Sequence, residues 1–207
     1  MAVPDSLPQR IFLLAYNPEK GRVGLDTYLG AMLRAAALAD LYQGGHLTDE
    51  RGRPAIDVRH PCRDPVLDAL LEEIAGSKPH SWQSWIGHRQ RATVRAVRQQ
   101  LNDGGWVHLQ PHKILGLFPT TEVTIRDPRV REELLDRVNT TLHKPIGGID
   151  PADAALVAII AAGDLNLVLD RKTKRANKQR IQELTKLSGP IGPALHKSIQ
   201  AAATGEV

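Results

Sequence analysis

Three Asp-Pro pairs stand immediately before stretches of helical periodicity, at Asp64-Pro65, Asp127-Pro128 and Asp150-Pro151. An aspartate accepts hydrogen bonds from the free N–H groups of a first helical turn, and a proline in that turn removes no donor that the helix needs. The pairs therefore predict helices over about 65–75, 128–142 and 151–162. Three helix starts of one type favour a mainly helical fold.

Apolar residues at helical spacing predict further helices between and beyond these starts. These helices cover Leu25–Gln43, a short turn at 82–86, a basic segment from His88 to the Gly104-Gly105 pair, and the ranges 164–186 and 190–203. The apolar run Ile11–Tyr16 is either a short buried strand or the first turn of a helix. Helices thus account for most of the chain.

Two segments read instead as β-hairpins. His46–His60 consists of two strand-like runs around a Gly-Pro turn. Trp106–Gln110 and Ile114–Phe118 alternate like strands and are joined by the turn residues Pro-His-Lys. We therefore expect a mainly α, single-domain helical bundle with two or three β-hairpins, spanning residues 1–207.

Composition narrows the class of protein. The chain has 207 residues, 27 basic and 23 acidic, and an apolar content of 42%, which suits one globular domain. Its N-terminal apolar run is too short for a signal peptide core, and no segment approaches the roughly 18 continuous apolar residues of a membrane span. The single Cys62 permits no internal disulfide. We expect a cytoplasmic protein whose membrane contact, where it has one, is peripheral.

Enzyme motifs are absent from the sequence. There is no glycine-rich phosphate loop, no His-Glu-x-x-His and no cysteine pair. The neighbour Arg63 is the one feature that would lower the pKa of the Cys62 thiol. His108 and His112 are four residues apart across the predicted turn, with no third ligand in view. We expect no catalytic residue, no metal site and no cofactor.

Basic residues gather in two places. His88, Arg89, Arg91, Arg95 and Arg98 fall on the helix before Gly104, and RKTKRANKQR at 171–180 has six basic residues and no acid. Such clusters are either solvated helix faces or surfaces for anions, since guanidinium groups bind phosphate oxygens in pairs. Nucleic acid and phospholipid headgroups both satisfy an anion surface. Clustering alone leaves these alternatives open.

Four passages resemble the Golgi phosphoprotein three family, peripheral membrane proteins that bind phosphatidylinositol 4-phosphate, in an actinobacterial form. The passages are IFLLAYNPEKGRV with LGAMLRAAALADLYQGGHL, VRAVRQQLNDGGWV with ILGLFPTTEVTIRDP, IDPADAALVAIIAAGDLNLVL, and DRKTKRANKQRIQEL. They occur in the family's order and cover nearly the whole chain. The resemblance implies a mostly helical bundle with β-hairpins, in agreement with the periodicity.

The resemblance also implies a headgroup pocket made of an aromatic residue and several arginines. Its first arginine falls on Arg34 and another on Arg91. The next arginine falls on Val94, beside Arg95, and the aromatic position falls on Leu25. We therefore expect phospholipid headgroup binding by Arg34, Arg91, Arg95 and Leu25.

The family's hairpin mediates self-association, which the resemblance transfers to the 106–125 hairpin of this chain. Its apolar residues Ile114, Leu115, Leu117 and Phe118 are the expected contacts with a partner hairpin. The alternative is that these residues pack against the core of their own chain. Cytosolic tails of membrane proteins are further candidate partners.

The sequence-based hypothesis is a non-enzymatic, peripheral membrane protein that binds anionic phospholipid headgroups in a basic pocket. A winged-helix-like nucleic-acid-binding protein is one alternative, because a basic helix followed by a hairpin is also the outline of that motif. Nucleic acid is nevertheless not the expected partner. A protein-interaction adaptor without lipid binding is the other alternative.

Overall fold

A computed structural model describes residues 2–23, 28–58, 60–114 and 118–204, and within these ranges the protein is mainly helical with small antiparallel hairpins. The elements in chain order are α1 Leu7–Leu14, β1 Tyr16–Asn17, β2 Arg22–Val23, α2 Leu29–Gln43, β3 Leu47–Glu50, β4 Arg53–Ile56, α3 Pro65–Ala75, α4 Trp82–Gly87, α5 Gln90–Asp103, β5 Val107–Ile114, β6 Phe118–Ile125, α6 Arg129–His143, the 3-10 turn η1 Ile146–Gly148, α7 Pro151–Ala162, α8 Arg171–Ala176, α9 Lys178–Leu187 and α10 Ile191–Thr204. The expected fold class is confirmed.

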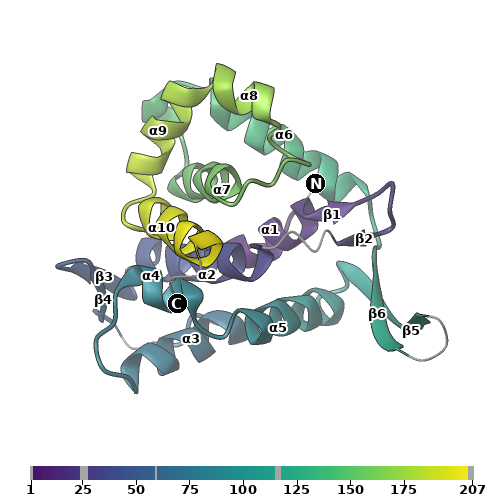
Figure 1. The fold of residues 1–207 in the computed structure, drawn as a ribbon, viewed down its shortest axis with the longest axis horizontal. Helices are drawn as coiled ribbons and strands as arrows, with labels where there is room; N and C mark the ends of the chain where they lie inside the picture. The colour runs from purple at the N-terminus through teal and green to yellow at the C-terminus, as the bar shows by residue number, and fades with distance from the viewer. Residues whose placement is uncertain (1, 24–27, 59, 115–117, 205–207) are drawn as a thin grey trace.

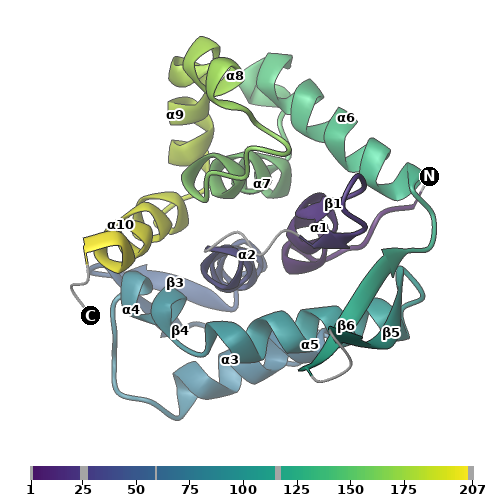
Figure 2. The same ribbon diagram turned by 45° about the vertical axis from the view of Figure 1, so that its right-hand side comes forward.

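Helix α2 is the centre of the molecule, and the other helices surround it (Figure 1; Figure 2). It packs against α1, α3, α5, α7 and α10, and nearly all of its side chains are buried. A helix that is apolar around its whole circumference belongs in a core, and its many alanines let neighbours approach closely. At Gly30 a Cβ atom would lie 2.6 Å from Gln90 Cβ, which shows how tightly α5 packs against α2.

The Asp-Pro helix starts are present as predicted. Asp64 accepts hydrogen bonds from the N–H groups of Val66 and Leu67 at the start of α3, and Asp150 accepts one from Ala152 at the start of α7. At α6 the pair is shifted by one residue, because Pro128 occupies the cap position and Asp127 receives the N–H of Arg129. The predicted segment 164–186 is divided into α8 and α9 at Asn177.

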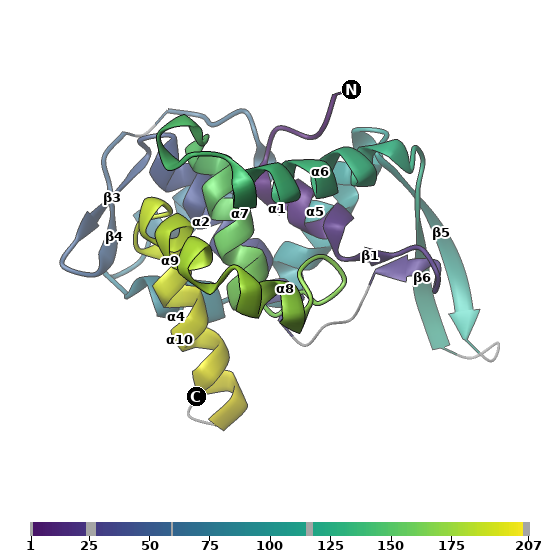
Figure 3. The same cartoon turned by 90° about the horizontal axis from the view of Figure 1, so that it is seen from above.

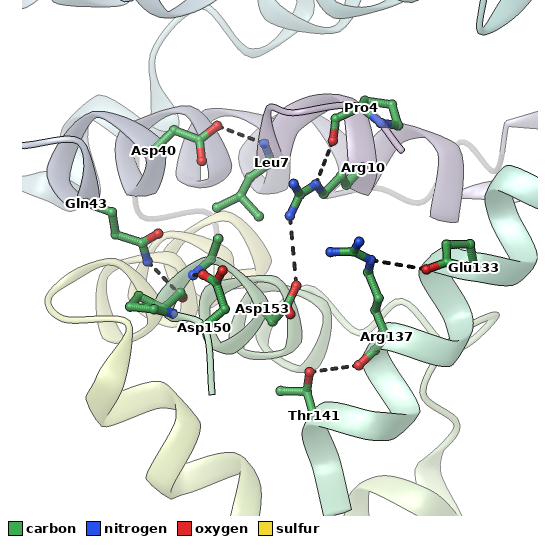
Figure 4. A network of polar contacts seen from close by, with 12 residues as sticks. Pro4, Leu7, Arg10, Asp40, Gln43, Glu133, Arg137, Thr141, Asp150 and Asp153 are labelled. Atoms are coloured by element: carbon green, nitrogen blue, oxygen red, sulfur yellow. Dashed lines mark hydrogen bonds and ion pairs between the residues drawn. The ribbon is translucent and has the colours of Figure 1, made fainter. Parts of the chain in front are cut away.

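Helix α1 is held at its start by a carboxylate from α2. The Leu7 N–H donates to Asp40 Oδ2 over 2.8 Å, so Asp40 serves as a cap from a distant part of the chain (Figure 4). Arg10 connects the same helix to α7, with its NH1 atom 3.9 Å from Asp153 Oδ1. Ile11–Leu14 therefore forms the end of a helix rather than its first turn, and only Tyr16 of the expected strand pairs, in β1.

Both expected hairpins form, but each turn lies elsewhere than predicted. In β3–β4 the residues Glu50 and Arg53 pair, so the turn is Arg51-Gly52, and both of these residues have positive φ. In β5–β6 the pairing runs from Val107–Ile125 to Ile114–Phe118, which places Pro111 and its neighbours inside a strand. A proline is tolerated there because each strand of a two-stranded ribbon has a free edge. The hairpins β3–β4 and β5–β6 lie at opposite ends of the molecule (Figure 1; Figure 3).

Within the described ranges, no helix combines the length and the apolar character needed to cross a bilayer.

Candidate functional site

Helix α5 has one face in the core and one in solvent. Thr93, Val97 and Leu101 are buried at helical spacing, and the half-buried Val94 also packs against the core. Val94 therefore has a packing role at the position where the family resemblance places an arginine. Arg91 and Arg95 lie on the exposed side, one helical turn apart.

Neither Arg91 nor Arg95 has a hydrogen-bond or ion-pair partner in the described part of the chain. Two unpaired guanidinium groups at this spacing form a positive surface that is open to solvent. Such groups bind planar or tetrahedral anions with two donors each.

The start of α5 carries further positive charge. Arg89 occupies the cap position in the left-handed conformation, with φ of 47°, and its side chain does not cap the helix. No acidic residue lies in the first turn. The helix itself therefore places no negative charge at the positive end of its dipole. Helix starts of this kind favour phosphate and other anions.

Arg34 belongs to a separate cluster where α2 meets α3, α4 and the start of α5. Its Nε donates to the Trp85 carbonyl oxygen over 3.1 Å, and its NH1 donates to Glu73 Oε2 over 3.2 Å. The other carboxylate oxygen of Glu73 accepts from Arg89 NH1, also over 3.2 Å. Glu73 thus bridges two guanidinium groups from different helices.

Exposure separates the two arginines of this cluster. The Arg34 side chain is 3% exposed and the Arg89 side chain 61%. Burial lowers the pKa of Arg34, whereas the charge of Glu73 raises it, and the guanidinium remains protonated. The buried NH2 atom of Arg34 has no hydrogen-bond partner in the part of the chain that is described. The exposed Arg89 therefore lies close to a buried cation that Glu73 satisfies only in part.

The predicted site residues have different placements. Arg91 and Arg95 share one exposed face of α5, while Arg34 is buried and is connected through Glu73 to Arg89, not to Arg91. Leu25 lies outside the described residues. Sequence reasoning missed Glu73 and the cap position of Arg89. The available signal for Glu73 was a carboxylate beside the apolar residues Leu70, Leu71 and Ile74 of one helix.

Two of the four predicted self-association residues belong to the described part of the β5–β6 hairpin. Ile114 and Phe118 form its last described backbone pair, and Leu115 and Leu117 lie outside the described residues. At the other end of the hairpin, Val107 and Val123 are buried. The base of the hairpin is therefore anchored in the core.

The second basic segment, 171–180, is partly structural. Lys174 pairs with Asp164, and Arg180 donates to Glu183 and to the carbonyl oxygens of Thr141 and Lys144 at the end of α6. Arg171 and Arg175 are exposed on α8. Helix α8 lies on the opposite side of α2 from α5 (Figure 1; Figure 2).

The structure gives no support for activation of Cys62. Burial, followed by a hydrogen bond and the charge of Asp68, raises the pKa of the Cys62 thiol to about 12. The expected influence of Arg63 is therefore outweighed, and the thiol is neutral at pH 7. Within the described ranges, no group of three or more histidine, cysteine or acidic side chains is arranged to hold a metal ion.

The fold and site define a helical protein with β-hairpins and an uncompensated basic helix surface. The family model described as Golgi phosphoprotein 3 (GPP34) matches residues 7–202, nearly the whole chain. The chain belongs to this family, as its sequence motifs indicated. No curated protein was found to match it.

Proposed function

We propose that the protein binds the phosphorylated headgroup of an anionic phospholipid of the phosphatidylinositol 4-phosphate type, without catalysing a reaction. Membership of the Golgi phosphoprotein 3 family supports this class of ligand. The observation that carries the proposal is the unpaired, exposed arginine pair Arg91 and Arg95 beside the uncapped start of α5. Attachment to the cytoplasmic leaflet is then peripheral.

The headgroup phosphate makes its first contacts with exposed donors. Arg91 and Arg95 supply guanidinium groups from consecutive turns, and Arg89 extends the positive surface past the helix start. Each basic residue close to an anionic leaflet contributes about 1 kcal/mol. The helix dipole adds to this attraction because phosphate lies at its positive end.

Arg34 contributes in a second step. A phosphate oxygen reaches its guanidinium only by taking the place of Glu73, since the side chain is buried and already paired. The phosphate first competes with the Glu73 carboxylate for Arg89, which is the exposed partner of Glu73. Arg34 therefore sets the position of Glu73 and, through it, the availability of Arg89.

The hairpin tip supplies the proposed contact between copies of the protein. Apolar residues around Ile114 and Phe118 pair with a second hairpin, or engage the cytosolic tails of membrane proteins, while the buried base holds the strands in place. Several weak headgroup sites on one oligomer increase the attachment to a membrane through effective concentration.

The function is tested by co-sedimentation with vesicles of phosphatidylcholine alone or with a few per cent of phosphatidylinositol 4-phosphate, at low and moderate salt. We expect sedimentation only with the phosphorylated lipid, weakening as salt rises. A gel shift with random duplex DNA runs in parallel. Equal binding to both vesicle types, or stronger binding to duplex DNA at moderate salt, would overturn the proposal.

A further inference from the structure

A second candidate site lies between α7, α9 and α10, on the other side of α2 from α5 (Figure 1; Figure 2). These three helices pack against one another and enclose a groove of about 540 Å³. Small-molecule sites in proteins span about 300–1,000 Å³, so the groove has the size for one ligand.

The floor of the groove is apolar and made of small side chains. Ala158, Ala161 and Ala162 of α7 form one side, and Ile181 of α9 lies opposite. Ala161 and Ala162 are only half-buried although they face neighbouring helices. At Gly192 of α10 a Cβ atom would lie 2.7 Å from the Thr185 methyl carbon, so α9 and α10 nearly touch there. The small apolar side chains of the floor are complementary to a hydrocarbon chain.

The rim of the groove is basic. Lys174, Lys178 and His196 line it, and no acidic residue of the described part of the chain does. Lys174 is neutralised by Asp164, whereas Lys178 is exposed and without an ion-pair partner among the residues that the structure describes. An ammonium group at the edge of an apolar groove is complementary to a ligand with one anionic end and one apolar end.

We propose that this groove binds a single-chain anionic amphiphile, namely a long-chain carboxylate. The hydrocarbon chain lies on the alanine floor, and the carboxylate lies at the rim against Lys178. Burial of methylene groups supplies the affinity, and the ammonium–carboxylate contact sets the direction of the chain. The site is independent of the headgroup site, because α2 separates the groove from α5.

The probe is sodium dodecanoate below its micelle concentration, measured by isothermal titration calorimetry on the full chain. Dodecanol and dodecyltrimethylammonium are the neutral and cationic comparisons. We expect saturable 1:1 binding of dodecanoate, at least about tenfold tighter than either comparison, the scale of one charge-assisted hydrogen bond.

Two variants locate the site. Ala162→Leu fills the groove from a half-buried position and should abolish binding. Lys178→Glu changes only an exposed side chain and should weaken binding about tenfold or more. Lys186→Glu, on the same helix but away from the groove, is the matched control and should bind as wild type, as should the Arg91→Gln/Arg95→Gln protein.

Thermal unfolding confirms that each variant is folded. Absence of saturable dodecanoate binding by the wild type would overturn the proposal. So would equal binding of the cationic amphiphile, or wild-type affinity in folded Lys178→Glu. Loss of membrane binding by the Arg91→Gln/Arg95→Gln protein, without any change in its dodecanoate binding, would support a groove site that is separate from the headgroup site.

Discussion

Glu73 holds Arg34 with one carboxylate oxygen and Arg89 with the other, at 3.2 Å in both cases. The contact joins a buried guanidinium on α2 to an exposed one at the start of α5 through a residue of α3. It therefore couples the packing of three helices to the charge available at the basic surface. The headgroup proposal and the stability of this junction depend on the same carboxylate.

The first prediction concerns stability. Glu73→Gln removes the charge that compensates Arg34, and an amide oxygen satisfies only part of the guanidinium. We expect the free energy of unfolding in urea to fall by about 1–3 kcal/mol. Glu72→Gln is the matched control, since Glu72 is exposed and unpaired among the described residues, and should change stability by less than about 0.5 kcal/mol. Equal effects of the two variants would contradict the role of Glu73.

The cap of α1 predicts a pH dependence. Burial raises the pKa of Asp40 to about 7, although the Leu7 N–H and Arg10 oppose the increase. The folded protein therefore binds this proton more tightly than the unfolded chain does. The contribution of Asp40 to stability is largest at low pH and decreases as pH rises from about 4 to 7, at about 1.4 kcal/mol per pH unit at most.

Asp40→Asn tests this dependence, because an amide oxygen still accepts from Leu7 and does not titrate. Urea unfolding of both proteins between pH 4.5 and pH 8 gives the difference in their stability. We expect Asp40→Asn to gain relative to wild type as pH rises, and to level off above about pH 7. A difference that is constant with pH would contradict the raised pKa.

Close helix packing predicts opposite outcomes for two glycines. A Cβ atom at Gly163 would lie 2.4 Å from the sulfur of the buried Met32, whereas one at Gly87 would meet nothing within 4 Å. Gly163→Ala should therefore destabilise the protein by about 1–3 kcal/mol through overpacking. Gly87→Ala should be neutral or stabilise by up to about 1 kcal/mol, because alanine reduces the entropy of the unfolded chain. Thermal unfolding distinguishes the two.

The hairpin tip predicts a change in assembly without a change in fold. Ile114→Asp with Phe118→Asp places charges at the last described pair of the hairpin, and a charge is unfavourable in an apolar contact between copies. We expect multi-angle light scattering to report a lower mass for this variant than for wild type at the same concentration. His108→Asp/Thr124→Asp, an exposed pair nearer the base, is the control. The same mass for tip variant and wild type would remove the hairpin from the assembly proposal.

Local patterns allowed much of the fold to be predicted. The caps at Asp64 and Asp150 depend on contacts two or three residues away, so the sequence displays them directly. The hairpin turn was misplaced because Pro111 resembles a turn residue, although a ribbon edge accommodates it in a strand. The partner of Arg34 lies 39 residues away on another helix. Only the packing of α3 against α2 brings the two together, and no local pattern reports it.

The central claim, that α5 is the membrane-binding surface, is tested by two charge-matched variants. Arg91→Gln/Arg95→Gln and Arg171→Gln/Arg175→Gln each remove two exposed positive charges, from α5 and from α8 on the other side of α2. Their partitioning is measured onto vesicles containing phosphatidylinositol 4-phosphate at moderate salt. We predict that partitioning of the α5 variant falls at least about tenfold, at about 1 kcal/mol per arginine. Partitioning of the α8 variant should fall less than about twofold, because α8 lies outside the electrostatic field of the anionic membrane surface. Equal losses for the two variants, or wild-type partitioning of the α5 variant, would contradict the account.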